Sequence, residues 1–209
     1  MSTPALYSFR RCPYAMRARM GLNASGVDYE HREIVLRDKP AAMLTASPKG
    51  TVPVMDFGDH VLEESLDILL WSLSKNDPKS WMPTNPDERE AQLAFIQGVE
   101  DDFKPHLDLY KYGNRFEEEK AEATEHRDIA AKYLKTLETR LINNDQLFGP
   151  TISLADIATF PFVRQFANTD RKWFDALPLP SLQVWLDLHL NSDLFKTIMT
   201  KHPLWVEIE

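Results

Sequence analysis

The chain of 209 residues carries 24 lysines and arginines against 32 aspartates and glutamates, so its formal net charge is -8. Nucleic-acid binding needs concentrated positive charge, and we therefore expect no nucleic-acid partner. Hydrophobic residues make up 43% of the chain, as in an ordinary globular protein, but no apolar stretch is long enough for a membrane span. The N-terminus lacks the features of a secretory signal and there is one cysteine, which favours a reducing, cytoplasmic location.

The first third of the chain alternates strand-like and helical patterns. Their order predicts a βαβ unit, a crossover and then a ββα unit. Proline cannot donate to a strand ladder, so Pro53 marks an edge, a bulge or a special turn. The expected strands are Ala5–Tyr7, Tyr29–Val35, Val52–Asp56 and His60–Leu62; the expected helices are Pro13–Ala24 and Ser65–Ser74, and a short helical or irregular piece is expected around Pro40–Thr45.

Cys12 lies where the first expected strand gives way to the first expected helix. We expect Cys12 at the N-cap and Pro13 at the first helical position, where a missing N–H has no consequence. Helix N-termini lower a thiol pKa from about 8.5 to roughly 3.5 to 7.5, which predicts a reactive thiol. The alternative is a buried, inert cysteine. Ala15 stands where a dithiol enzyme has its second cysteine, so turnover through Cys12 needs an external thiol, for which glutathione is the cytosolic candidate.

Polar residues and prolines fill residues 77–88, which predicts a linker between residues 1–76 and an all-helical part over residues 89–209. Ser153 and Asp156 have the spacing of a capping box at a helix start. The chain has no glycine-rich phosphate loop, and its six histidines lack ligand spacing, so we expect no nucleotide and no metal. In the all-helical part, apolar residues recur every three or four positions in two runs. They are Leu93, Ile96, Val99, Phe103, Leu107 and Tyr110 in the first, and Ile129, Tyr133, Leu137 and Leu141 in the second.

Several short motifs, taken in order, resemble the glutathione transferase superfamily, and within it the cysteine-type members: the omega class and the two-domain, glutaredoxin-like bacterial proteins. The resemblance implies an α/β thioredoxin-like, glutathione-binding N-terminal domain over residues 1–76 and an all-α C-terminal domain over residues 89–209. It allows either a homodimer or a monomer. The motifs are Cys12-Pro13-Tyr14-Ala15, Asp38-Lys39-Pro40, Thr51-Val52-Pro53-Val54, Glu63-Glu64-Ser65 and Ser153-Leu154-Ala155-Asp156.

The resemblance implies roles for the residues around the cysteine. Cys12 is the catalytic thiol, which forms a mixed disulfide with glutathione. Pro53 resembles the family's cis-proline, and Val52 before it pairs its backbone N–H and C=O with the cysteinyl unit of glutathione. The alternative for Pro53 is an ordinary trans proline at a sheet edge. Tyr14 lies beside the thiol and packs on glutathione.

Further residues match the positions that bind the two ends of glutathione. Glu64 and Ser65 hold the γ-glutamyl group, although Ser65 could equally cap its helix. Lys39 meets the glycyl carboxylate; the residue type alone would suggest a surface lysine. Arg17 and Arg19 are expected at the surface or between domains.

The leading interpretation is glutathione-dependent thiol transfer, with deglutathionylation or dehydroascorbate reduction implied by the resemblance. Glutathione is then the co-substrate, and a small or protein disulfide or electrophile is the partner. Tyr7 and Ser8 lie near the hydroxyl position of other transferase types, but because a cysteine is present we interpret Tyr7 as strand core and Ser8 as uninvolved. The alternatives are glutathione conjugation to electrophiles and a non-catalytic, transferase-like interaction protein.

Overall fold

The computed structural model describes residues 3–113 and 120–207. The chain divides into unit 1, Met1–Ser80 with Ser192–Glu209, and unit 2, Trp81–Asn191. In the described part of the chain, no helix combines the length and apolar character that a membrane crossing requires.

Unit 1 is a mixed sheet with helices on both faces. Its strand order is β2-β1-β3-β4, with β1 parallel to β2 and antiparallel to β3, and β3 antiparallel to β4. This confirms the expected βαβ and ββα order, although β2 is shorter than the expected strand. The elements are β1 (Ala5–Ser8), α1 (Pro13–Ser25), β2 (Glu30–Glu33), α2 (Ala41–Ala46), β3 (Val54–Asp56), β4 (Val61–Leu62), α3 (Ser65–Lys75) and α10 (Asp193–Ile198).

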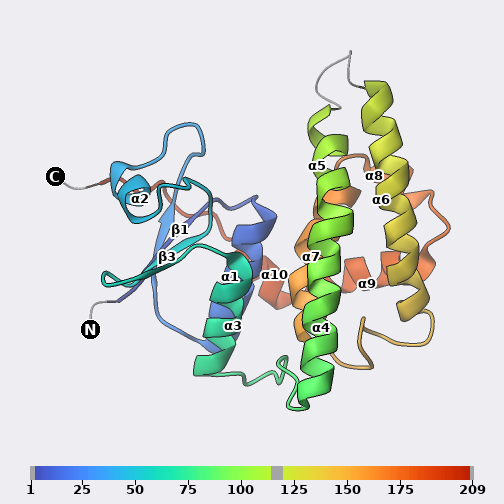
Figure 1. Cartoon of the computed structure of the whole chain (residues 1–209), viewed down its shortest axis with the longest axis horizontal. Helices are drawn as coiled ribbons and strands as arrows, with labels where there is room; N and C mark the ends of the chain where they lie inside the picture. The colour runs from blue at the N-terminus through green and yellow to red at the C-terminus, as the bar shows by residue number, and fades with distance from the viewer. Residues whose placement is uncertain (1–2, 114–119, 208–209) are drawn as a thin grey trace. The chain divides into compact units, whose positions relative to one another are not determined.

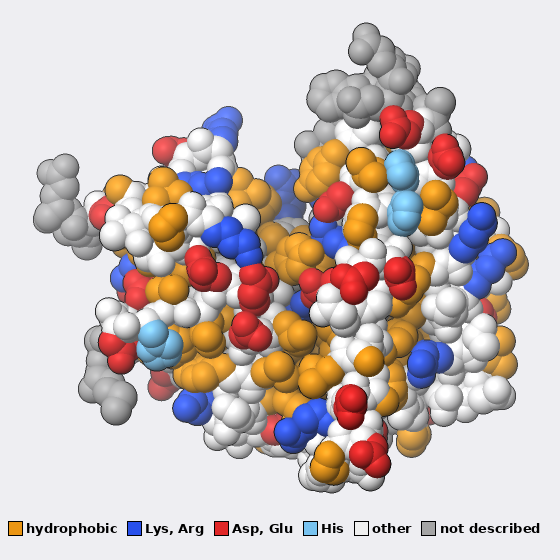
Figure 2. Space-filling model, viewed as in Figure 1, with side chains coloured by type: hydrophobic (Ala, Val, Ile, Leu, Met, Phe, Trp, Pro, Cys, Tyr) orange, Lys and Arg blue, Asp and Glu red, His pale blue; other side chains and the backbone are white. Residues whose placement is uncertain are grey.

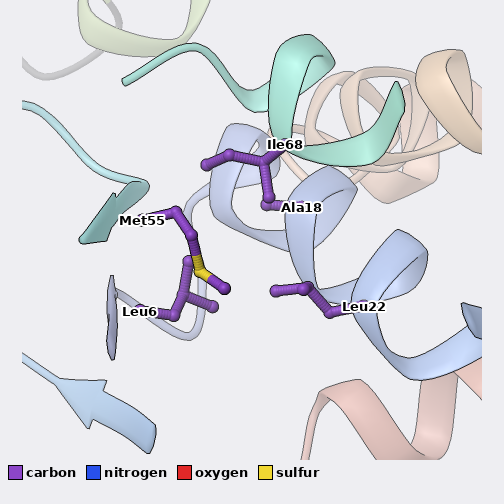
Figure 3. Close-up of a cluster of buried hydrophobic side chains, with 5 residues drawn as sticks. All are labelled: Leu6, Ala18, Leu22, Met55 and Ile68. Carbon is purple, nitrogen blue, oxygen red and sulfur yellow. The ribbon is translucent and has the colours of Figure 1, made fainter. Parts of the chain in front are cut away.

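Each face of the sheet has its own core, because successive strand residues point to opposite sides. On one face, Leu6 and Met55 from paired strands pack with residues of α1 and α3, which lie side by side in Figure 1. Figure 3 shows this cluster, which is completed by Ala18, Leu22 and Ile68. On the other face, Tyr7 and Val54 pack with Met43 of α2. The two cores fix the sheet between the helices and so hold the end of β1 and the start of α1 in place.

Unit 2 is helical, as expected. Most of its apolar repeat is buried: Ile96, Val99, Phe103 and Leu107 are fully buried and Tyr110 nearly so, whereas Leu93, Ile129 and Tyr133 are half-buried. The repeat does not run along one continuous α-helix, because a π-helical turn separates α4 from α5. The helices are α4 (Pro86–Gly98), the π-helical turn η1 (Val99–Phe103), α5 (Lys104–Gly113), α6 (Lys120–Leu141), α7 (Leu154–Ala167), α8 (Arg171–Asp175) and α9 (Pro180–Asn191).

The last residues of the chain pack with unit 1, although the sequence pattern placed them in the helical part at 89–209. Trp205 N–H donates to the Glu33 carbonyl over 2.8 Å, and Leu204 forms a parallel bridge with Glu33. The Trp205 indole meets the Tyr7 ring edge to face, with centroids 5.7 Å apart. Leu204 and Trp205 thereby pair with the end of β2, the outer strand of the sheet. The expected linker at 77–88 differs as well, since α4 already begins at Pro86.

Candidate active site

Cys12 occupies the N-cap of α1, with Pro13 in the first turn of the helix, as expected. The chain leaves β1 at Ser8 and turns at once, and Cys12 N–H closes the turn by donating to the Phe9 carbonyl over 3.0 Å. The Cys12 carbonyl then accepts from Met16 N–H at 2.9 Å, which begins the helical pattern. The cysteine as a whole is half-buried. The thiol of a half-buried cysteine at a helix start can react with a ligand and feel the positive end of the helix dipole.

The segment before β3 runs beside this thiol. Cys12 Sγ lies 3.7 Å from the Val52 carbonyl oxygen, within reach of a weak S–H donor. The Val52–Pro53 peptide bond is cis, as the motif implied. Both residues are buried. A hydrogen bond from the protonated thiol favours the neutral form, so a group that takes over the Val52 carbonyl would free the thiol to ionise.

Ser65, the first residue of α3, meets a buried cation. Arg17 Nη1 donates to Ser65 Oγ over 3.3 Å, and the Arg17 guanidinium lies 5.9 Å from the Tyr14 ring centroid. Arg17 is fully buried, so it does not lie at the surface, which was one of the two positions expected for it. A hydroxyl that accepts one hydrogen bond still has its own hydrogen to donate. Ser65 can therefore donate to an incoming carboxylate with a positive charge behind it.

The acidic and basic residues of the expected ligand site lie toward the surface. Glu64 is exposed and forms an ion pair with Lys49, a residue that sequence reasoning missed because no motif includes it. Lys39 Nζ lies 3.6 Å from the point where a Cβ on Gly50 would stand. Gly50 has a φ of +64°, a conformation that favours glycine and brings the chain round toward Val52. The Lys39 ammonium thus lies beside the segment that leads to Val52, which suits an anionic ligand, whereas the Lys49 ammonium is paired with Glu64.

Arg19 is also buried, at 2% exposure, so the surface alternative is wrong for this residue as well. Its guanidinium donates to Ser8 Oγ over 2.5 Å and to the Arg10 carbonyl over 2.7 Å. The Arg19 side chain therefore contacts the turn between β1 and Cys12.

The hydroxyls of Tyr7 and Ser8 are engaged within unit 1. Both residues are fully buried, and Tyr7 packs in the sheet core as expected. Tyr7 Oη accepts from Arg32 Nη1 over 2.6 Å, and burial raises the pKa of Tyr7. A hydroxyl with a raised pKa inside the core is poorly suited to activating a ligand thiol.

Folding brings histidines together that are far apart in the sequence. His106 and His126 place their Nδ1 atoms 2.7 Å apart, and Figure 2 shows adjoining histidine side chains in pale blue over α5 and α6. His31 stacks on His202 with centroids 4.0 Å apart. Among the residues that the structure describes, no three His, Cys, Asp or Glu side chains are placed to hold a metal ion.

Two protein-family models match the chain, one in each unit. The model described as "Glutathione S-transferase, N-terminal domain" matches residues 6–81. The model described as "Glutathione S-transferase, C-terminal domain" matches residues 120–188. The first match contains every residue that the motifs assign to the candidate site.

Individual proteins with similar sequences cover most of the chain. A probable glutathione S-transferase GSTU6 from Oryza sativa subsp. japonica is 26% identical over 90% of this chain and 84% of its own. Glutathione S-transferase omega-1 from Mus musculus is 26% identical over 87% of this chain and 74% of its own. A glutathione transferase family member from Pseudomonas fluorescens pf-5, solved with two glutathione bound, has the same fold with a TM-score of 0.82 at 20% identity, over 94% of this chain and 92% of that one.

Proposed function

Because this chain belongs to the glutathione S-transferase family, we propose that it is an enzyme that binds glutathione in unit 1 and transfers thiols through Cys12. The cytoplasm, where glutathione is abundant and thiols stay reduced, is the compartment that suits this chemistry.

In the proposed complex, glutathione lies extended along the segment before β3. Its cysteinyl unit pairs with the backbone of Val52, as one residue of an added strand. Its γ-glutamyl carboxylate accepts from Ser65, backed by Arg17, while Glu64 meets its ammonium group. Lys39 meets the glycyl carboxylate, and Tyr14 packs on the ligand beside the thiol. Each charged group of the tripeptide then faces a side chain of opposite charge.

The proposed reaction is a pair of thiol–disulfide exchanges. The Cys12 thiolate attacks the glutathionyl sulfur of a mixed disulfide; one S–S bond breaks, a new one forms between Cys12 and glutathione, and the other thiol leaves as a thiolate that takes a proton. A second glutathione thiolate then attacks the enzyme-bound disulfide. Oxidised glutathione leaves, and the Cys12 thiolate is restored.

One observation carries this proposal: the thiol of the half-buried Cys12 at a helix start, with its sulfur 3.7 Å from Val52 O. The ligand's cysteinyl N–H would take over that carbonyl, which releases the thiol at the moment the substrate arrives. The hydroxyls that could support conjugation instead, those of Tyr7 and Ser8, are fully buried, and burial raises the pKa of Tyr7.

Cys12→Ser separates thiol transfer from its rivals. We expect this variant to keep its fold and to lose the reduction of a glutathionylated small disulfide by at least about a hundredfold, because a serine hydroxyl is not a comparable nucleophile. The same preparations are assayed with a chlorinated aromatic acceptor. Conjugation that exceeds thiol transfer and survives in Cys12→Ser would favour the conjugating enzyme, and failure to retain glutathione on an affinity matrix would favour a non-catalytic interaction protein.

A further inference from the structure

The turn that carries Cys12 rests on the side chain of Arg19, which follows Cys12 by about two helical turns in α1. Arg19 Nη2 donates to the Arg10 carbonyl over 2.7 Å, and Nη1 lies 3.5 Å from the Phe9 carbonyl, which also accepts from Cys12 N–H. Nη1 donates to Ser8 Oγ over 2.5 Å. The planar, forked guanidinium group of Arg19 therefore holds both the end of β1 and the turn that follows it.

A buried carboxylate completes this support. Glu33, at the end of β2, is 7% exposed, and its Oε1 accepts from Arg10 N–H over 2.7 Å. The peptide groups on both sides of Arg10 are thus held, one by Glu33 and the other by Arg19. Glu33 Oε2 lies 3.1 Å from His31 Nε2, and Arg19 Nε donates to the Ile198 carbonyl over 3.1 Å. The C-terminal segment therefore contributes to the same support.

Electrostatics adds to this geometry. Burial lowers the pKa of Arg19, and the negative charge of Glu33 and, to a lesser extent, that of an ionised Cys12 act in the opposite direction. Burial also disfavours the Glu33 carboxylate, but hydrogen bonds from His31 and Arg10 N–H outweigh it and lower the Glu33 pKa. A buried cation thus lies close enough to interact with the Cys12 thiolate, in a medium where water screens charge weakly.

We propose that Arg19 is a positioning residue for Cys12: its fork holds the Phe9–Cys12 turn so that the thiol stands at the start of α1, and its charge favours the thiolate. The effect of Arg19 on the reactivity of the Cys12 thiol does not depend on the proposed function, whereas its effect on turnover rests on that function. A purely structural alternative exists, in which Arg19 only ties α1 to the end of β1 and to the C-terminal segment.

The test measures the rate at which iodoacetamide alkylates Cys12 in the folded full-length protein as a function of pH. In Arg19→Gln we expect alkylation near pH 6 to be about threefold to tenfold slower, because the thiol pKa rises when the cation is lost. Arg19→Lys keeps the charge without the planar fork, so its thiol pKa should lie between those of wild type and Arg19→Gln. Arg11→Gln is the matched control: it removes an exposed arginine beside Cys12, and we expect a change within about twofold.

A second variant has an effect of opposite sign. Glu33→Gln keeps an acceptor for Arg10 N–H but removes the charge that offsets Arg19, so alkylation near pH 6 should become faster by about twofold to fivefold. If Arg19→Gln does not fold, the alkylation rate of Glu33→Gln tests the proposal in its place. Folded Arg19 or Glu33 variants with the wild-type pH profile would overturn the proposal. Wild-type protein without thioltransferase activity would instead overturn the proposed function, and the alkylation comparison would remain valid.

Discussion

The two units bury polar side chains for different purposes. In unit 2 the buried acceptors Glu138 and Gln92 serve helix starts. Glu138 accepts from the N–H groups of Ser181 and Leu182 at the beginning of α9, at 3.1 and 2.7 Å. Gln92 accepts from Ala155 N–H at the beginning of α7 over 3.1 Å. Such groups satisfy backbone donors that a helix start leaves without intrahelical partners.

In unit 1 the buried charged side chains, Arg17, Arg19 and Glu33, lie around one turn and one helix start instead. Arg19 and Glu33 hold the turn before Cys12, and Arg17 meets Ser65 at the beginning of α3. Backbone satisfaction explains part of this arrangement, but Arg17 donates to a side-chain hydroxyl, and burying a guanidinium group is expensive. We infer that unit 2 uses buried polarity for stability and that unit 1 uses it to prepare a thiol and an anion site.

The largest effect that this comparison predicts is on the stability of unit 2. Asp156 is fully buried and accepts from Ser153 N–H, Leu147 N–H and Trp185 Nε1, at 2.9, 2.8 and 2.9 Å. Asp156→Ala leaves these donors unsatisfied, so we expect a loss of about 3 to 5 kcal/mol in the free energy of unfolding, measured with urea. At temperatures where the variant is folded, alkylation of Cys12 should stay within about twofold of wild type.

Asp170→Ala is the matched control for that variant. Asp170 caps α8 by accepting from Trp173 N–H over 3.0 Å, but it is exposed. We expect a loss of only about 1 kcal/mol. Equal losses in the two variants, or a change in thiol reactivity caused by Asp156→Ala, would remove the distinction between the units.

The next effect is a pH dependence of stability. His189 is buried against Phe160 and Trp185, and burial lowers its pKa to about 4, with Asp156 opposing the shift. The unfolded chain takes up a proton near pH 6.5, whereas the folded chain does so only near 4, so the unfolded state binds more protons between these values. Stability should therefore fall as the pH drops through this window, by up to roughly 3 kcal/mol.

Urea unfolding near pH 7 and near pH 5 measures this dependence. In His189→Gln the titrating group is absent, and the difference between the two pH values should shrink by most of its wild-type size. Burial also lowers the pKa of His106 and His202, so a smaller dependence of the same sign should persist. An unchanged pH dependence in His189→Gln would show that other groups are responsible.

The smallest effect concerns the anion site of unit 1. Ser65→Ala removes the hydroxyl between Arg17 and the proposed γ-glutamyl carboxylate, so we expect KM for glutathione to rise about fivefold to tenfold. The value of kcat should stay within about twofold, because the hydroxyl does not take part in bond breaking. Ser74→Ala, on the exposed side of the same helix, is the control and should change neither constant. A fall in kcat without a change in KM would assign Ser65 to the chemistry instead.

Local patterns predicted much of the fold and the position of the thiol. The order of the elements in unit 1 follows from alternation and helical repeats, and the position of Cys12 at the N-cap follows from the proline after it. These features depend on neighbours within a few residues. For the same reason the buried repeat from Ile96 to Tyr110 could be recognised, although the π-helical turn within it could not.

The features that sequence reasoning missed depend on contacts between distant residues. Arg17 meets Ser65 across 48 positions, and Arg19 meets Ile198 across 179. An arginine within a helical repeat is ordinarily a surface residue, and no local signal marks one with a buried partner. The return of the C-terminal segment to β2 and the ion pair of Lys49 with Glu64 were missed for the same reason.

The most direct test of the central claim is the intact mass of the folded protein after incubation with oxidised glutathione. We predict that one glutathionyl group attaches per chain, that peptide mapping places it on Cys12, and that added glutathione removes it at a rate compatible with turnover. Cys12→Ser should remain unmodified under the same conditions. A wild-type protein that binds glutathione but never acquires this adduct would contradict thiol transfer through Cys12.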